Sequence, residues 1–92
     1  MTADPLTMHV LIEGRVQGVG YRAWCAGEAE ARSLSGWVRN LPNGTVEAVF
    51  SGPSDVVVDM LDALWQGPPF ARVKTVSNLE AVEAVPESFE VR

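Results

Sequence analysis

The sequence predicts a single α+β domain in which one mostly antiparallel sheet carries two helices on one face. Three observations predict it. The hydrophobic period alternates along the chain between that of a strand and that of a helix, glycine and proline separate these segments, and 92 residues suffice for one core. With 47% hydrophobic residues, the composition is that of a globular domain. We expect residues 1–92 to form this domain, with residues 1–7 as a flexible N-terminal extension.

The first half of the chain predicts a strand, a helix and a second strand. Residues 8–13 alternate apolar and polar side chains, as a half-buried strand does. A loop at 14–20 leads into the alanine-rich segment 21–34, whose apolar residues recur four apart as in an amphipathic helix. Gly36 is the expected break after this helix, and residues 37–40 predict a short strand.

The second half begins with a hairpin and a second helix. Asn43 and Gly44 tolerate the positive φ angles of a tight turn, and residues 45–50 alternate as the returning strand. Ser54 is the expected N-cap of the next helix, and Gly67 with the two prolines after it ends that helix. The apolar stripe of this helix consists of Val57, Met60, Leu61, Leu64 and Trp65.

Two further strands complete the prediction, one over residues 71–79 and a short one over residues 88–92. The order of the main elements is β-α-β-β-α-β. Each β-α-β crossover is right-handed and joins parallel strands, whereas a hairpin pairs its strands antiparallel. The simplest structure with these connections is a ferredoxin-like α/β sandwich. Because this fold serves many functions, the chemistry has to be argued from the site residues.

Charge and composition exclude several classes of protein. The net charge is −5, and residues 1–46 hold four basic and four acidic side chains, so no basic stripe for nucleic acid exists. No apolar run approaches the roughly 20 residues of a membrane span. Residues 1–7 lack the basic and apolar blocks of a secretory signal, and the single Cys25 forms no intrachain disulfide. We therefore expect a cytoplasmic monomer that binds neither nucleic acid nor membrane.

The stretch with the most chemical information is GRVQGVGYR, residues 14–22, where a strand passes into a helix. Its glycines let successive N–H groups point into one concavity, and the helix start adds unsatisfied N–H groups. The glycines alone fit a plain tight turn equally well. Arg22 favours an anion site, because an arginine opposes the dipole in a first helical turn and its fork fits two phosphate oxygens. The candidate phosphate-binding residues are Val16, Gln17, Gly18, Val19, Gly20 and Arg22.

Other polar residues have simpler structural interpretations. Asn40 ends the short strand before the hairpin, and turn capping is the favoured role for an asparagine there. His9 is out of phase with the apolar face of its strand, and Cys25 lies on the apolar face of its helix as a buried, inert thiol. Three aspartates of the second helix lie on its polar side, namely Asp55, Asp59 and Asp62. Because these side chains are expected to face water, we predict no metal site.

Together these segments resemble the acylphosphatase family. The family pattern is a Gly-x-Val-Gln-Gly-Val-x-aromatic-Arg loop, then Gly-Trp-Val-Arg-Asn, then an Asn/Asp-Gly hairpin. It is matched here by residues 14–22, 36–40 and 43–44, and the resemblance covers residues 8–92. The chain departs from the pattern at residues 32–34, which read Arg-Ser-Leu where Leu-Gly-Leu is usual.

The resemblance implies hydrolysis of an acyl phosphate to a carboxylate and inorganic phosphate, without a cofactor. Arg22 falls on the catalytic arginine, Asn40 on the catalytic asparagine that orients the attacking water, and residues 16–20 on the phosphate loop. Inorganic phosphate is then both product and inhibitor. A carboxylate leaving group, whose conjugate acid has a pKa of about 4 to 5, needs no general acid. Two alternatives remain: a non-catalytic domain that binds acyl phosphates or other anions, and a ferredoxin-like RNA-binding module, which would need a basic sheet face.

Overall fold

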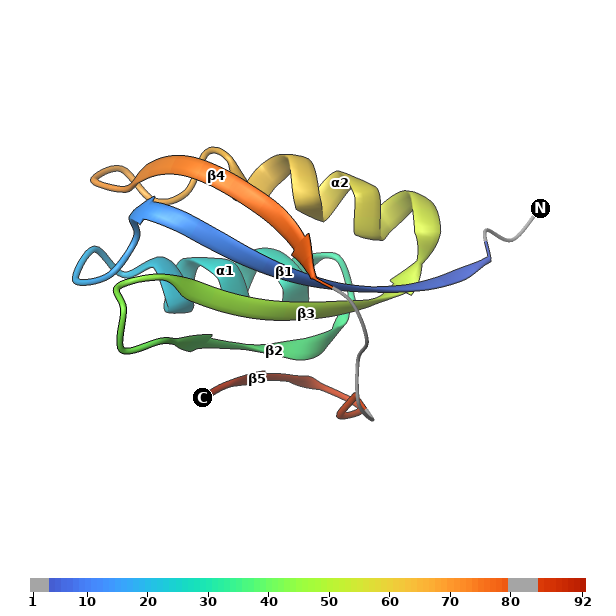
Figure 1. Cartoon of the computed structure of the whole chain (residues 1–92). Coiled ribbons are helices and arrows are strands. Elements are labelled where there is room, and N and C mark those ends of the chain that lie inside the picture. The colour runs from blue at the N-terminus through green and yellow to red at the C-terminus, as the bar shows by residue number, and fades with distance from the viewer. Residues whose placement is uncertain (1–3, 80–84) are drawn as a thin grey trace.

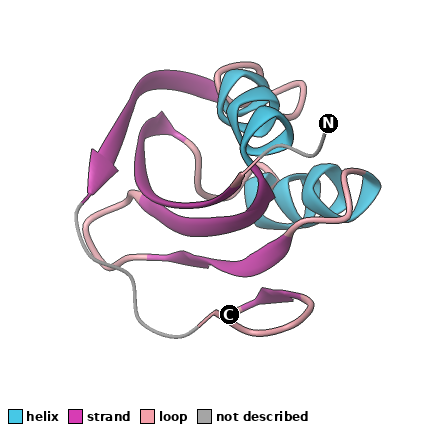
Figure 2. Cartoon of the chain, turned by 90° about the vertical axis from the view of Figure 1, so that its right-hand side faces the viewer, coloured by secondary structure: helices cyan, strands magenta, loops and turns pink. Residues whose placement is uncertain are grey.

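The computed structural model describes residues 4–79 and 85–92. The elements in chain order are β1 (Pro5–Arg15), α1 (Tyr21–Ala31), β2 (Ser35–Asn40), β3 (Val46–Pro53), α2 (Ser54–Leu64), β4 (Arg72–Leu79) and β5 (Phe89–Val91). The strands form one twisted sheet in the order β4-β1-β3-β2-β5, and both helices lie on one face of it (Figures 1 and 2). Strands β2 and β5 are parallel, and the other neighbours are antiparallel. The predicted ferredoxin-like α+β fold is thereby confirmed.

The first strand and the first helix differ in extent from the sequence prediction. β1 begins at Pro5, because residues 5–7 pair with residues 51–53 of β3, so these residues belong to the sheet and not to a flexible extension. Residues 1–3 lie outside the described residues. α1 ends at Ala31, where the chain turns through Ser33 at a φ of 56°. Gly36, the expected helix breaker, lies inside β2, where a Cβ would collide with the carbonyl oxygen of Val49.

The prediction that Ser54 caps α2 is wrong. β3 continues to Pro53, which is the N-cap residue, so the strand passes directly into the helix. The Ser54 N–H donates to the carbonyl oxygen of Asp4 at 2.9 Å, and no side chain within residues 4–79 and 85–92 caps this helix start. Trp65 also differs from expectation. It follows the end of α2 and is 51% exposed instead of completing the apolar stripe.

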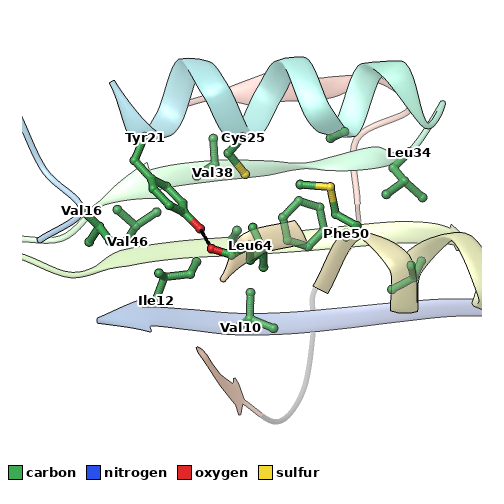
Figure 3. Close-up of a cluster of buried hydrophobic side chains, with 14 residues drawn as sticks. Val10, Ile12, Val16, Tyr21, Cys25, Leu34, Val38, Val46, Phe50 and Leu64 are labelled. Atoms are coloured by element: carbon green, nitrogen blue, oxygen red, sulfur yellow. Dashed lines mark hydrogen bonds between the residues drawn. The ribbon is translucent and has the colours of Figure 1, made fainter. Parts of the chain in front are cut away.

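The core lies between the sheet and the two helices (Figure 3). It includes the predicted faces of β1 and β3 and the predicted stripe of α2 apart from Trp65, and Cys25 is fully buried in it, as predicted. Burial raises the pKa of the Cys25 thiol, which keeps the thiol protonated and unreactive. Tyr21 at the start of α1 donates from its hydroxyl to the carbonyl oxygen of Leu64 at 2.7 Å, and so joins this point to the end of α2 (Figure 3).

The topology brings several chain segments together at one end of the sheet. The loop after β1, the start of α1, the β2–β3 hairpin and the end of β5 all lie at the left of Figure 1. Among the residues described, no helix combines the length and apolar character that a membrane span requires.

Candidate active site

A pocket of about 290 Å³ opens at this end of the sheet, beside the start of α1. Tyr21, Ala23 and Val91 line it. So do six of the seven predicted site residues, namely Val16, Gln17, Gly18, Gly20, Arg22 and Asn40. Val19 is the exception, because its side chain packs against the core. The two motifs, far apart in the sequence, therefore contribute to one concave site of a size suited to a small molecule.

The backbone of the pocket floor depends on two glycines. Gly18 has a φ of 74° and Gly20 a φ of 79°, both in the left-handed region that favours glycine. Gly20 is also the N-cap of α1 and has no side chain to cap the helix, and no other side chain in the described part of the chain caps its first N–H groups. The first turn of α1 carries no acidic residue either. The helix thus presents free donors and the positive end of its dipole to the pocket, which suits an anion.

Arg22 is held at the pocket by Arg92, the residue that follows β5. Its Nη1 donates to the main-chain oxygen of Arg92 at 3.0 Å, and the Arg92 N–H donates in turn to the carbonyl oxygen of Val38 in β2 at 2.8 Å. Val91 lines the pocket beside it. Sequence reasoning missed this contribution of β5. The only local signal is that Phe89 and Val91 alternate, which predicts a strand but no partner for Arg22.

Asn40 ends β2 and carries a buried polar atom. Among the described residues, its side-chain oxygen Oδ1 has no hydrogen-bond partner. The side chain that bonds within the hairpin is Asn43, whose Oδ1 accepts from the N–H of Thr45 at 3.2 Å and from its hydroxyl at 2.6 Å. A buried acceptor without a partner is costly. Asn40 also lines the pocket, so its side-chain amide lies beside the space that a ligand or water would occupy.

Comparison with known proteins agrees with this geometry. A sequence model described as acylphosphatase matches residues 8–91. The chain belongs to the acylphosphatase family. An acylphosphatase of Azorhizobium caulinodans is 59% identical over 80 residues, which are 87% of this chain and 85% of the relative. An acylphosphatase of Rhizobium meliloti is 47% identical over 99% of this chain and 97% of its own.

Solved structures of this family have the same fold. An acylphosphatase from Coxiella burnetii superimposes with a TM-score of 0.89 at 39% identity, covering 97% of this chain and 94% of its own. An acylphosphatase from Bacillus subtilis superimposes with a TM-score of 0.83 at 33% identity, covering 94% of this chain and 97% of its own. The activity is accordingly that of an acylphosphatase, a hydrolase whose substrates are acyl phosphates. Neither of the two alternatives drawn from the sequence receives support from these comparisons.

A second cluster of polar side chains lies on the sheet face away from the helices. Glu47 in β3 accepts hydrogen bonds from His9 Nε2 at 2.8 Å and from Arg39 Nε. Burial alone would raise the pKa of Glu47, but the bonds from His9 and Arg39 outweigh it and hold that pKa below its usual value. The guanidinium groups of Arg39 and Arg92 lie 5.3 and 5.0 Å from the centre of the Trp37 ring. His9 is thus a sheet-face residue, as predicted.

One acidic residue of α2 forms an ion pair with an arginine. Asp59 accepts from Arg32 Nε at 2.9 Å, which joins α2 to the end of α1. Within residues 4–79 and 85–92, no three His, Cys, Asp or Glu side chains gather closely enough to hold a metal ion.

Proposed function

We propose that the pocket binds the phosphoryl group of an acyl phosphate through Arg22 and the backbone N–H groups of residues 16–20, while Asn40 orients the attacking water. The observation that carries this proposal is that Asn40, Arg22 and the uncapped start of α1 meet in one pocket, although the two residues come from separate motifs. The product, inorganic phosphate, carries the same phosphoryl oxygens as the substrate and is expected to inhibit competitively.

Phosphoryl binding uses groups that are held in place before the substrate arrives. The main-chain oxygen of Arg92 takes one donor of Arg22, and a guanidinium has five, so a fork remains for two phosphoryl oxygens. The loop N–H groups and the α1 dipole stabilise the negative charge on the phosphoryl oxygens at the transition state. Because these donors are already oriented, they need little reorganisation when the reaction occurs.

The hydrolytic step requires one water and no general acid from the protein. The side-chain amide of Asn40 hydrogen-bonds the water as donor or acceptor, and the water oxygen attacks phosphorus in line with the leaving group. The new bond joins the water oxygen to phosphorus, and the bond that breaks joins phosphorus to the acyl oxygen, which leaves as a carboxylate. An amide is too weak a base to keep the proton of the water, so that proton passes to a phosphoryl oxygen. His9 lies on the opposite sheet face and takes no part.

Replacing Asn40 with alanine tests this proposal. We expect kcat for benzoyl phosphate to fall by roughly 10²-fold, the scale seen when one positioned polar group is lost. The inhibition constant of inorganic phosphate should barely change, because Arg22 and the loop remain. The measurements are kcat, the phosphate inhibition constant and the denaturation midpoint on one sample. A variant with near-normal kcat and a stability loss of about 1 kcal/mol would show that Asn40 serves the turn instead.

A further inference from the structure

The side chain of Gln17 points away from the phosphate loop to which it belongs. Its Nε2 donates to the carbonyl oxygens of Leu41 and Thr45, each at 2.8 Å. These two residues form the mouth of the β2–β3 hairpin, where the Leu41 N–H also donates to the Thr45 carbonyl at 2.9 Å. One amide nitrogen thereby uses both of its protons to join the loop to the hairpin.

This link connects the two parts of the pocket that the proposed reaction must align. Gln17 lies within the phosphate loop, and Leu41 follows Asn40 directly in the sequence. β1 and β2 are not neighbours in the sheet, because β3 lies between them. The sheet therefore connects the loop to Asn40 only through a third strand, whereas the Gln17 amide connects them directly.

We propose that Gln17 is a positioning residue whose side chain fixes the distance between the phosphate loop and Asn40. It acts on turnover by aligning the water on Asn40 with the phosphoryl group on the loop, and its side chain does not itself hold the substrate. The inference rests on the proposed function. A displacement of about 1 Å between reacting groups can cost roughly 10²-fold in rate, so such a link has a large effect on kcat.

The chemistry of the contact explains why a glutamine is required. Two carbonyl oxygens face Nε2, so the side chain must donate twice from one atom and carry no charge into a half-buried place. Glutamate has the same shape, but its carboxylate would place negative oxygens against two carbonyl oxygens. Methionine has a similar length and no donor. These two residues therefore separate hydrogen bonding from packing.

The first test compares Gln17→Glu with the wild type across pH, with benzoyl phosphate as substrate. At pH 8 we expect kcat to fall about tenfold or more, while the phosphate inhibition constant changes by less than about threefold. The facing carbonyls and burial should raise the pKa of the new carboxyl above its usual value of about 4.3. On acidification the protonated acid can donate one hydrogen bond, so the ratio of variant to wild-type kcat should recover toward pH 5. A kcat at pH 8 within threefold of wild type would overturn the proposal.

The second test combines Gln17→Met with Asn40→Ala and separates this proposal from the function on which it rests. If Gln17 acts through Asn40, Gln17→Met lowers kcat about tenfold alone but only slightly in the Asn40→Ala background. Full additivity of the two losses would overturn the role of Gln17 and leave that of Asn40 intact. An Asn40→Ala enzyme with normal kcat would instead overturn the proposed function. The denaturation midpoint of each variant shows that the folded protein is being compared.

Discussion

The pocket and the opposite sheet face are built from similar residues and are used differently. On the sheet face, Glu47 is bonded to His9 and Arg39. In the pocket, Asn40 Oδ1 has no partner among the described residues, and no side chain caps the start of α1. His9 Nδ1 on the sheet face also lacks a partner among the described residues, so an unpartnered atom alone does not mark a site. The pocket adds a concave lining and an uncapped helix start, which together suit a ligand. Residue type alone therefore does not identify the site: Arg22 and Arg39 are both arginines, and their surroundings distinguish them.

The largest difference between the two regions is expected for a pair of matched arginine substitutions. Arg22→Lys keeps the charge but loses the planar fork, so kcat/KM should fall by about 10²-fold or more. Arg39→Lys keeps a positive charge beside Glu47 on the other face and should leave kcat/KM within about threefold. Steady-state kinetics with benzoyl phosphate measure both. Equal losses of kcat/KM in the two variants, or full activity of Arg22→Lys, would contradict the different roles assigned to the two arginines.

Glu47→Gln is expected to have a smaller effect, and one on stability instead of activity. The folded-state pKa of Glu47 is lowered, so its ionised form contributes stability above the unfolded pKa, and that contribution disappears as pH falls through the folded pKa. The variant should lose about 2 kcal/mol at pH 7, the scale of hydrogen bonds to a charged group, and much less at pH 3. Its kcat in the folded fraction should stay normal. Urea denaturation at the two pH values, together with kinetics at pH 7, measures this prediction. A pH-independent loss would contradict the role of the carboxylate.

The smallest effect is a local response to inorganic phosphate. Titration should shift the backbone amide resonances of Gly18 and Gly20, because the loop N–H groups bind the anion. Trp37 and Arg39, on the other sheet face, should shift little and serve as internal controls. Two-dimensional NMR of the labelled protein follows all four. Larger shifts at Trp37 and Arg39 than at the glycines would place the anion site on the sheet face away from the helices and contradict the proposed pocket.

Much of the fold and part of the site follow from local sequence. The alternation of residues 8–13 and the stripe of α2 predict their elements, since periodicity requires only that one face be buried. Gly18 and Gly20 adopt the positive φ angles for which a loop of this kind uses glycine. Ser54 and Trp65 show where this reasoning fails. Serine is a common helix cap, and Trp65 continues the apolar spacing of the stripe. Ser54 does not cap the helix because β3 extends to Pro53, and Trp65 leaves the stripe because α2 ends at Leu64.

The sequence by itself determined the element order, the glycine loop and the candidate pair Arg22 and Asn40. Only the tertiary structure decided what holds them. The main-chain oxygen that Arg22 contacts lies 70 residues away in the chain, and the carbonyls that Gln17 joins lie 24 and 28 residues away. Backbone carbonyls occur at every residue, so a sequence carries no signal for which one is used. That choice depends on the order of strands in the sheet, which brings the ends of β1, β2 and β5 to one place.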